Sequence, residues 1–255
     1  MSTLISAISA FAATPTTLPS DTKLDLVLLI GQSNMAGRGK VEAEDKVANP
    51  RVWSLDKENQ WVPAVDPIHF DKPQVAGVGL GTTFGKTLAE KNPDAVIGLI
   101  PSAFGGTSID QWKKDGKLYS AAIARAKIAM KHGTLKAILW HQGESDSSAA
   151  KVPLYAATLD QLIADLRADL DAPEVPFIAG QIGRFHYAVS PEGEEFNARL
   201  LELPKRVPHT GVATSEGLTD LGDQTHFNSA SLRELGRRYA GAYCELVRAA
   251  AQAEK

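Results

Sequence analysis

One serine stands where a hydrolase would need a nucleophile. The segment LDLVLLIGQSNMAGRG begins at Leu24 with a continuous apolar run, then changes at Gly31 to small and polar residues that include Ser33. An apolar run of this kind is typical of a strand buried on both faces of a sheet. We therefore expect Ser33 in a tight turn after a buried strand, with its hydroxyl exposed and its backbone N–H free.

A serine hydroxyl is a poor nucleophile unless a base takes its proton. The best base in the sequence is His226, in the segment DQTHFN. Asp223 lies three residues before it and can orient the imidazole from the same loop, which leads into a helix capped by Ser229. These residue types predict nucleophilic catalysis by a serine, a histidine and a carboxylate.

Two further segments carry groups that suit an oxyanion hole. The pair Gly105 and Gly106 offers an unobstructed backbone N–H, and Gln142 in WHQGESD offers a side-chain amide. Glu144 follows Gln142 by two residues and so faces the same way on an extended segment, from which it could also reach the imidazole. We favour Asp223 as the acid that orients the base and assign Glu144 a supporting role.

Apolar patterning indicates the elements that must position these residues. Continuous apolar runs predict strands at residues 26–30, 95–100, 135–140, 175–182 and, more weakly, 211–214, whereas helical patterns cover residues 81–91, 119–131, 155–170, 194–203 and 229–250. Such alternation predicts an α/β fold with a parallel sheet and helices on both faces. Ligands of such sheets bind at the carboxyl ends of the strands, where the polar segments begin.

Composition limits the domain organisation and the partners. The chain has 255 residues, of which 44% are hydrophobic, and no linker or repeat divides it, so we expect one domain over residues 23–255. Residues 1–22 are either a flexible N-terminus or the remnant of a signal peptide, so the protein is secreted or periplasmic in the second case and otherwise cytoplasmic. A net charge of −3 with scattered basic residues argues against nucleic acid, and no apolar run reaches the roughly 20 residues that span a bilayer.

The four segments IGQSNMAGRG, GGTSIDQW, WHQGESD and DQTHFN together resemble the conserved blocks of the SGNH-hydrolase superfamily. The similarity lies in the branch of carbohydrate esterase family six and sialate O-acetylesterase-like proteins, which includes acetylxylan esterases, and covers about residues 24–247. It implies a flavodoxin-like three-layer α/β/α sandwich with a mostly parallel sheet. It also implies ester hydrolysis without a metal or cofactor, and an acetylated carbohydrate as substrate.

The resemblance also implies roles for single residues. Ser33 matches the nucleophile, Asp223 and His226 match the acid and base, and Gly106 matches the glycine of the second block. Gln142 replaces the asparagine of the superfamily name, as is usual in this branch. The activity implied is removal of O-acetyl groups from acetylxylan or sialic acid-type glycans through an acetyl-serine. The sequence does not decide between these substrates, nor does it give an oligomeric state.

Several other polar residues are candidates for the substrate pocket, and two further functions stay open. The pocket candidates are Gln32, Asn34, Gly105, His69 and Arg184, although a structural loop histidine is an equal interpretation of His69. A metal-dependent hydrolase could use His141, Glu144, Asp146, Asp223 and His226 as ligands, although they lack a tight metal-binding spacing. A carbohydrate-binding protein without turnover is the other alternative, against which the presence of Ser33, Asp223 and His226 argues.

Overall fold

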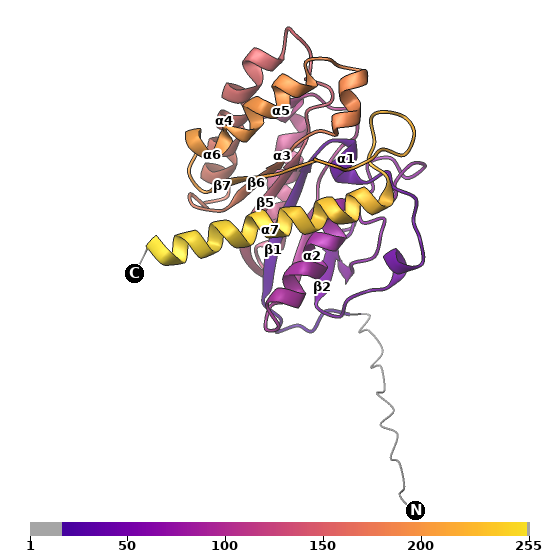
Figure 1. The fold of residues 1–255 in the computed structure, drawn as a ribbon. Coiled ribbons are helices and arrows are strands. Elements are labelled where there is room, and N and C mark those ends of the chain that lie inside the picture. The colour runs from indigo at the N-terminus through magenta and orange to yellow at the C-terminus, as the bar shows by residue number, and fades with distance from the viewer. Residues whose placement is uncertain (1–16, 254–255) are drawn as a thin grey trace, which may run out of the picture.

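A seven-stranded sheet forms the centre of the molecule in the computed structural model, which describes residues 17–253 (Figure 1). The strand order is β3-β2-β4-β1-β5-β6-β7, and all neighbours run parallel except β3, which is antiparallel to β2. The strands are β1 (Leu24–Gly31), β2 (Val52–Leu55), β3 (Trp61–Pro63), β4 (Ile97–Pro101), β5 (Gly133–His141), β6 (Phe177–Gly180) and β7 (Thr210–Ala213). The predictions made for residues 1–16 lie outside the described residues.

Helices cover both faces of this sheet, which confirms the predicted α/β fold with a mostly parallel sheet. On one face lie α2 (Leu80–Lys91) and α7 (Ser229–Ala253), and on the other α3 (Lys117–Ala129), α4 (Val152–Asp169) and α5 (Gly193–Leu201). Shorter elements are α1 (Ser33–Ala36), α6 (Leu203–Arg206) and the 3-10 helices η1 (Glu44–Lys46), η2 (Ile109–Trp112) and η3 (Arg184–Ala188). None of the described helices is long and apolar enough to cross a membrane.

The central strand β1 is apolar without interruption from Leu26 to Ile30 because it contributes to two hydrophobic cores. Leu26, Leu28 and Ile30 pack in the core beneath α3 and α4, whereas Val27 and Leu29 pack in the core beneath α2 and α7. Alternate side chains of a strand point to opposite faces, so a strand covered on both faces needs apolar residues at every position. This packing fixes the strand whose carboxyl end leads to Ser33.

The edge formed by β2 and β3 was not expected from the sequence. Both strands are short, and β3 has only three residues, all half-buried. The register pairs Trp53 with Pro63 and Leu55 with Trp61. A proline is tolerated in such an edge strand. Strands this short carry too little apolar patterning to be recognised in the sequence.

A buried carboxyl group lies beside α2, close to this edge. Asp66 is 6% exposed, and its Oδ1 accepts a hydrogen bond of 2.9 Å from the hydroxyl of Thr82. Burial raises the pKa of Asp66 to about 7, because ionisation would place a charge in the interior with few compensating groups.

Candidate active site

Ser33 begins the short helix α1 directly after β1, at the carboxyl end of the central strand. The turn depends on Gly31, whose φ of +133° and position leave no room for a side chain. A Cβ at this residue would lie 2.1 Å from the carbonyl oxygen of His141 in β5. The same oxygen accepts a hydrogen bond of 2.9 Å from the N–H of Gln32. The close approach of β1 and β5 therefore presents Ser33 at the edge of the sheet.

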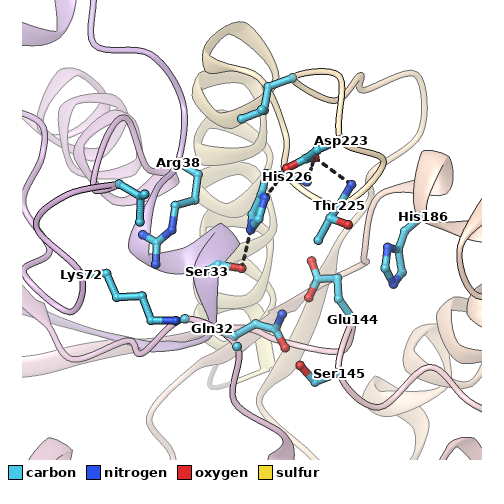
Figure 2. A pocket seen from close by; sticks show the side chains of 14 residues that line it. Gln32, Ser33, Arg38, Lys72, Glu144, Ser145, His186, Asp223, Thr225 and His226 are labelled. Atoms are coloured by element: carbon cyan, nitrogen blue, oxygen red, sulfur yellow. Dashed lines mark hydrogen bonds and ion pairs between the residues drawn. The ribbon is translucent and has the colours of Figure 1, made fainter.

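Ser33, His226 and Asp223 form a continuous hydrogen-bonded chain (Figure 2). The Oγ of Ser33 lies 3.0 Å from Nε2 of His226, and Nδ1 of His226 lies 2.6 Å from Oδ2 of Asp223. Nucleophile, base and orienting acid stand in hydrogen-bond reach of one another, as nucleophilic catalysis requires. The structure thus brings together the three residues that the sequence predicted.

The carboxylate of Asp223 is held within its own loop. Its Oδ1 accepts hydrogen bonds of 3.0 and 2.8 Å from the backbone N–H groups of Thr225 and His226. Partial burial works to raise the pKa of Asp223, but these bonds and the contact with the imidazole outweigh it and lower the pKa below its usual value. The carboxylate is therefore ionised and can stabilise a positive charge on His226.

The three residues open into a pocket of about 600 Å³, a volume within the usual range of small-molecule sites. Gln32, Gly105, Gly106 and Glu144 line it together with them. The sequence analysis expected Gln32 and Gly105 in the pocket, Gly106 in the oxyanion hole and Glu144 in a supporting role. Figure 2 shows Ser33 and His226 facing this space from α1 and from the loop before α7.

Two backbone N–H groups beside Ser33 have no acceptor among the described residues, those of Ser33 itself and of Gly106. Gly106 adopts a φ of +78°. The N–H of Gly105, in contrast, donates to Oδ2 of Asp71 at 2.8 Å, and a Cβ at Gly105 would lie 2.4 Å from Nη2 of Arg38. Asp71 and Arg38, joined by a buried ion pair of 2.7 Å, thus hold the glycine segment next to Ser33.

The structure corrects the expectation that the Gln142 amide faces the site. Gln142 is fully buried and does not line the pocket. The two hydrogens of its Nε2 are shared among three acceptors, namely Asp146, the carbonyl of Thr107 at 3.0 Å and Oε1 of Gln32 at 3.1 Å. The expectation assumed that side chains alternate between two faces along an extended segment. β5 ends at His141, one residue before Gln142, so this alternation does not extend to Gln142. Gln142 therefore lies behind the pocket and contacts it through Gln32.

The hydrogen bonds behind the pocket fix the orientation of the Gln32 side chain. Trp140 Nε1 donates to the hydroxyl of Tyr155 at 2.9 Å, and the single hydrogen of that hydroxyl is shared between Oε1 and the backbone oxygen of Gln142, at 2.9 and 3.0 Å. Asp146 and the carbonyl of Thr107 accept hydrogen bonds from Nε2 of Gln142 and so fix its amide. Gln142 must then present its nitrogen to Oε1 of Gln32. The nitrogen of Gln32 is left on the other side of its amide, away from Gln142, and Gln32 lines the pocket. A side-chain amide donor therefore does face the pocket, at residue 32.

Glu144 lines the pocket but does not contact the imidazole. Its Oε1 accepts a hydrogen bond from Nδ2 of Asn34 and lies 3.9 Å from Nε2 of His141. Among the described residues, Oε2 of Glu144 and Nε2 of His141 are buried without a hydrogen-bond partner. Burial lowers the pKa of His141, so this imidazole is neutral, while the nearby Glu144 works in the opposite direction. The acid in contact with His226 is Asp223.

Comparison with known proteins identifies the family. The family model described as "Carbohydrate esterase, sialic acid-specific acetylesterase" matches residues 23–245. The chain belongs to this carbohydrate esterase family. It is 32% identical over 238 residues to the probable carbohydrate esterase At4g34215 of Arabidopsis thaliana, covering 86% of this chain and 89% of that protein.

Solved structures show the same fold. The structure of the Arabidopsis protein superposes with a TM-score of 0.80 at 30% identity, covering 89% of this chain and 99% of that chain. NanS gives a TM-score of 0.76 at 17% identity over 91% and 99% of the two chains. A carbohydrate acetylesterase from Xanthomonas citri gives 0.67 at 20% identity over 86% and 55%. The last two similarities bear on the fold alone.

Three expected pocket residues of the esterase lie outside the pocket lining. Asn34 is fully buried and bonds to Glu144 and to the backbone around His226. His69 is also buried, and burial lowers its pKa to about 3, which fits the structural interpretation. Arg184 is directed to an ion pair of 3.2 Å with Glu216.

The pocket of the esterase is also lined by three basic residues that the sequence analysis did not single out. They are Arg38, Lys72 and His186. Arg38 lies within the first conserved block, so its position was a usable signal. Lys72 and His186 lie in a loop and in η3, and their proximity to Ser33 arises only from the fold. The Nδ1 of His186 is 3.0 Å from the carbonyl oxygen of Gln224, in the loop that carries His226.

The five candidate metal ligands of the esterase do not form a metal site. Among residues 17–253, no three histidine, cysteine, aspartate or glutamate side chains are grouped so that they could hold an ion. Asp146 instead pairs with Lys151 at 3.1 Å and accepts a hydrogen bond of 2.8 Å from the N–H of Ile109. The interpretation as a metal-dependent hydrolase therefore receives no support from the side-chain arrangement.

Proposed function

We propose that this carbohydrate esterase is a serine enzyme that removes O-acetyl groups from sugars through an acetyl-serine, and that residues 23–255 act as one domain. The observation that carries the proposal is the chain from Asp223 through His226 to Ser33, which ends in the pocket.

In the first step His226 Nε2 takes the proton of Ser33 as Oγ attacks the carbonyl carbon of the acetyl group. The positive charge that develops on the imidazole is stabilised by the ionised Asp223. The imidazolium then gives its proton to the sugar oxygen, so that the sugar leaves as an alcohol and the acetyl group stays on Ser33.

The negative charge on the carbonyl oxygen needs hydrogen-bond donors that are in place before reaction. The free N–H groups of Ser33 and Gly106 are suited to this role. We assign the third donor to the Nε2 of Gln32, with Gln142 holding that amide in place. In the second step water attacks the acetyl-serine, His226 takes the proton of the water, and acetate leaves as Ser33 regains its proton.

One lysine at the pocket could pair with an anionic sugar, although the carboxylates of Asp223 and Glu144 also line this space. Arg38 is paired with Asp71, but Lys72 has no ion-pair partner within 4 Å among the described residues. Its Nζ lies near Gly106, at 3.7 Å from the position of a Cβ on that glycine. We therefore propose acetylated sialic acid, which carries a carboxylate, ahead of acetylated xylan.

Covalent labelling tests the serine mechanism. Ser33→Ala is expected to abolish both labelling by an organophosphonate and the burst of product from a chromogenic acetate ester, because it removes the attacking oxygen. Ser145→Ala is the matched control, since Ser145 lines the same pocket without a contact to His226 and should label like the wild type. Labelling of the Ser33→Ala variant at the wild-type rate would remove Ser33 from the mechanism.

A further inference from the structure

The peptide groups on either side of His226 are both held by one buried side chain, Asn34. Its Oδ1 accepts a hydrogen bond of 3.1 Å from the N–H of Phe227, and its Nδ2 donates one of 3.0 Å to the carbonyl oxygen of Thr225. Asn34 is next to Ser33 in α1, so a single short element carries the nucleophile and holds the backbone of its base. The two ends of the Ser33–His226 hydrogen bond are thereby tied together.

This attachment matters because the loop backbone makes few other hydrogen bonds to the rest of the molecule. Within the described structure, the backbone of residues 220–227 makes side-chain hydrogen bonds outside its own loop and α7 only to Asn34 and His186. The bonds that Asp223 receives come from Thr225 and His226 themselves, so they orient the imidazole within the loop and not against Ser33. The side chains of His226 and Asp223 are 25% and 40% exposed, and packing anchors the loop mainly through Phe227, which is fully buried.

Glu144 helps to fix which way the Asn34 amide faces, together with the two peptide groups around His226. Its Oε1 accepts the second hydrogen of Nδ2, while the N–H of Phe227 requires an acceptor at Oδ1. The flipped amide would place an oxygen against a carboxylate and a carbonyl, and a nitrogen against an N–H. Each of these two contacts of the flipped amide would leave buried polar groups without hydrogen-bond partners, which costs free energy.

We propose that Asn34 is a positioning residue that sets the distance between Ser33 and His226, and that Glu144 acts through it by orienting its amide. The inference rests on the proposed function, in which Ser33 and His226 react. It gives Glu144 a role without contact to the imidazole.

The test compares substitutions at Asn34 with a matched buried asparagine. In Asn34→Asp a second oxygen faces Glu144 and the carbonyl of Thr225, and the repulsion is expected to displace His226 by a fraction of an ångström. This displacement should lower kcat and the rate of organophosphonate labelling by roughly 10- to 100-fold. KM should change little, since Asn34 does not line the pocket. In Asn34→Asp/Glu144→Gln the new amide can donate to the aspartate, and the labelling rate is expected to recover in part.

Asn197→Asp is the control. Asn197 is 3% exposed and likewise bonds one backbone N–H and one backbone carbonyl, in this case both of Ile182, at 3.0 and 2.9 Å, but it does not contact the loop. It should lower the melting temperature without slowing the labelling of the folded protein. Labelling of Asn34→Asp as fast as Asn197→Asp, or a double variant no faster than Asn34→Asp, would overturn the inference. Failure of the serine mechanism is separate, since it would appear as undiminished labelling of Ser33→Ala.

Discussion

Two neighbouring parts of the site are built in opposite ways. The histidine loop, residues 214–228, carries Asp223 and His226 on an exposed segment, and the hydrogen bonds of Asp223 within this loop join residues two to three positions apart. The amide floor, formed by Gln32, Gln142, Asp146 and Tyr155, is buried and joins residues up to 110 positions apart. The difference teaches that the pair of Asp223 and His226 is held together within one loop, which must itself be attached to the rest of the molecule. The amide floor needs no such attachment because the core surrounds it.

The largest expected effect belongs to the histidine loop. Asp223→Asn removes the charge that stabilises the imidazolium, and we expect kcat to fall by roughly 10⁴-fold, the loss known for the same change in the serine-protease triad. Glu144→Gln should cost far less, because Glu144 acts at a distance from the imidazole. Steady-state kinetics of the two folded variants decide the matter. The opposite ranking would make Glu144 the acid of the triad.

Substitutions in the amide floor are expected to lower the reaction rate less than Asp223→Asn does, but to lower the stability of the fold more. Gln32→Ala removes one oxyanion donor and should lower kcat by about 10²- to 10³-fold, with little change in unfolding free energy. Gln142→Ala also removes one hydrogen bond each from the buried Asp146 and Tyr155, at about 0.5–1.5 kcal/mol for each lost bond. Urea unfolding alongside kinetics separates the two. A kcat unaffected by Gln32→Ala would mean that a group other than Gln32 is the third oxyanion donor.

The smallest effect concerns substrate charge at the rim of the pocket. Lys72→Ala should raise KM for acetylated sialic acid by up to about fivefold, since exposed charge pairs contribute about 0–1 kcal/mol. KM for a neutral acetylated sugar should stay the same, and the effect should diminish with salt. Lys40→Ala is the control, because this exposed lysine does not line the pocket. An equal change for both substrates would argue against recognition of a carboxylate.

The comparison also explains which parts could be predicted from the sequence. Strands such as β1 and the pair Asp223 and His226 were recognised because their signal lies within a few consecutive residues. The orientation of Gln142 was predicted wrongly, since its partners Gln32 and Tyr155 come from other elements and the alternation ends with β5. The contact between Asn34 and Glu144 joins residues 110 positions apart, and no local pattern encodes it.

The buried carboxyl of Asp66 makes folding of the esterase a proton-uptake reaction at mildly acidic to neutral pH. Its folded-state pKa of about 7 exceeds the usual 3.8, so its contribution to stability is fully present below the unfolded value and is lost as pH rises through about 7. Asp66→Asn keeps an oxygen for the Thr82 hydroxyl but carries no titrating proton. Between pH 5 and pH 8 the wild type should lose about 2–3 kcal/mol of unfolding free energy relative to this variant. One interior carboxyl outside the pocket lining thus makes the folded enzyme less stable at neutral pH than at mildly acidic pH.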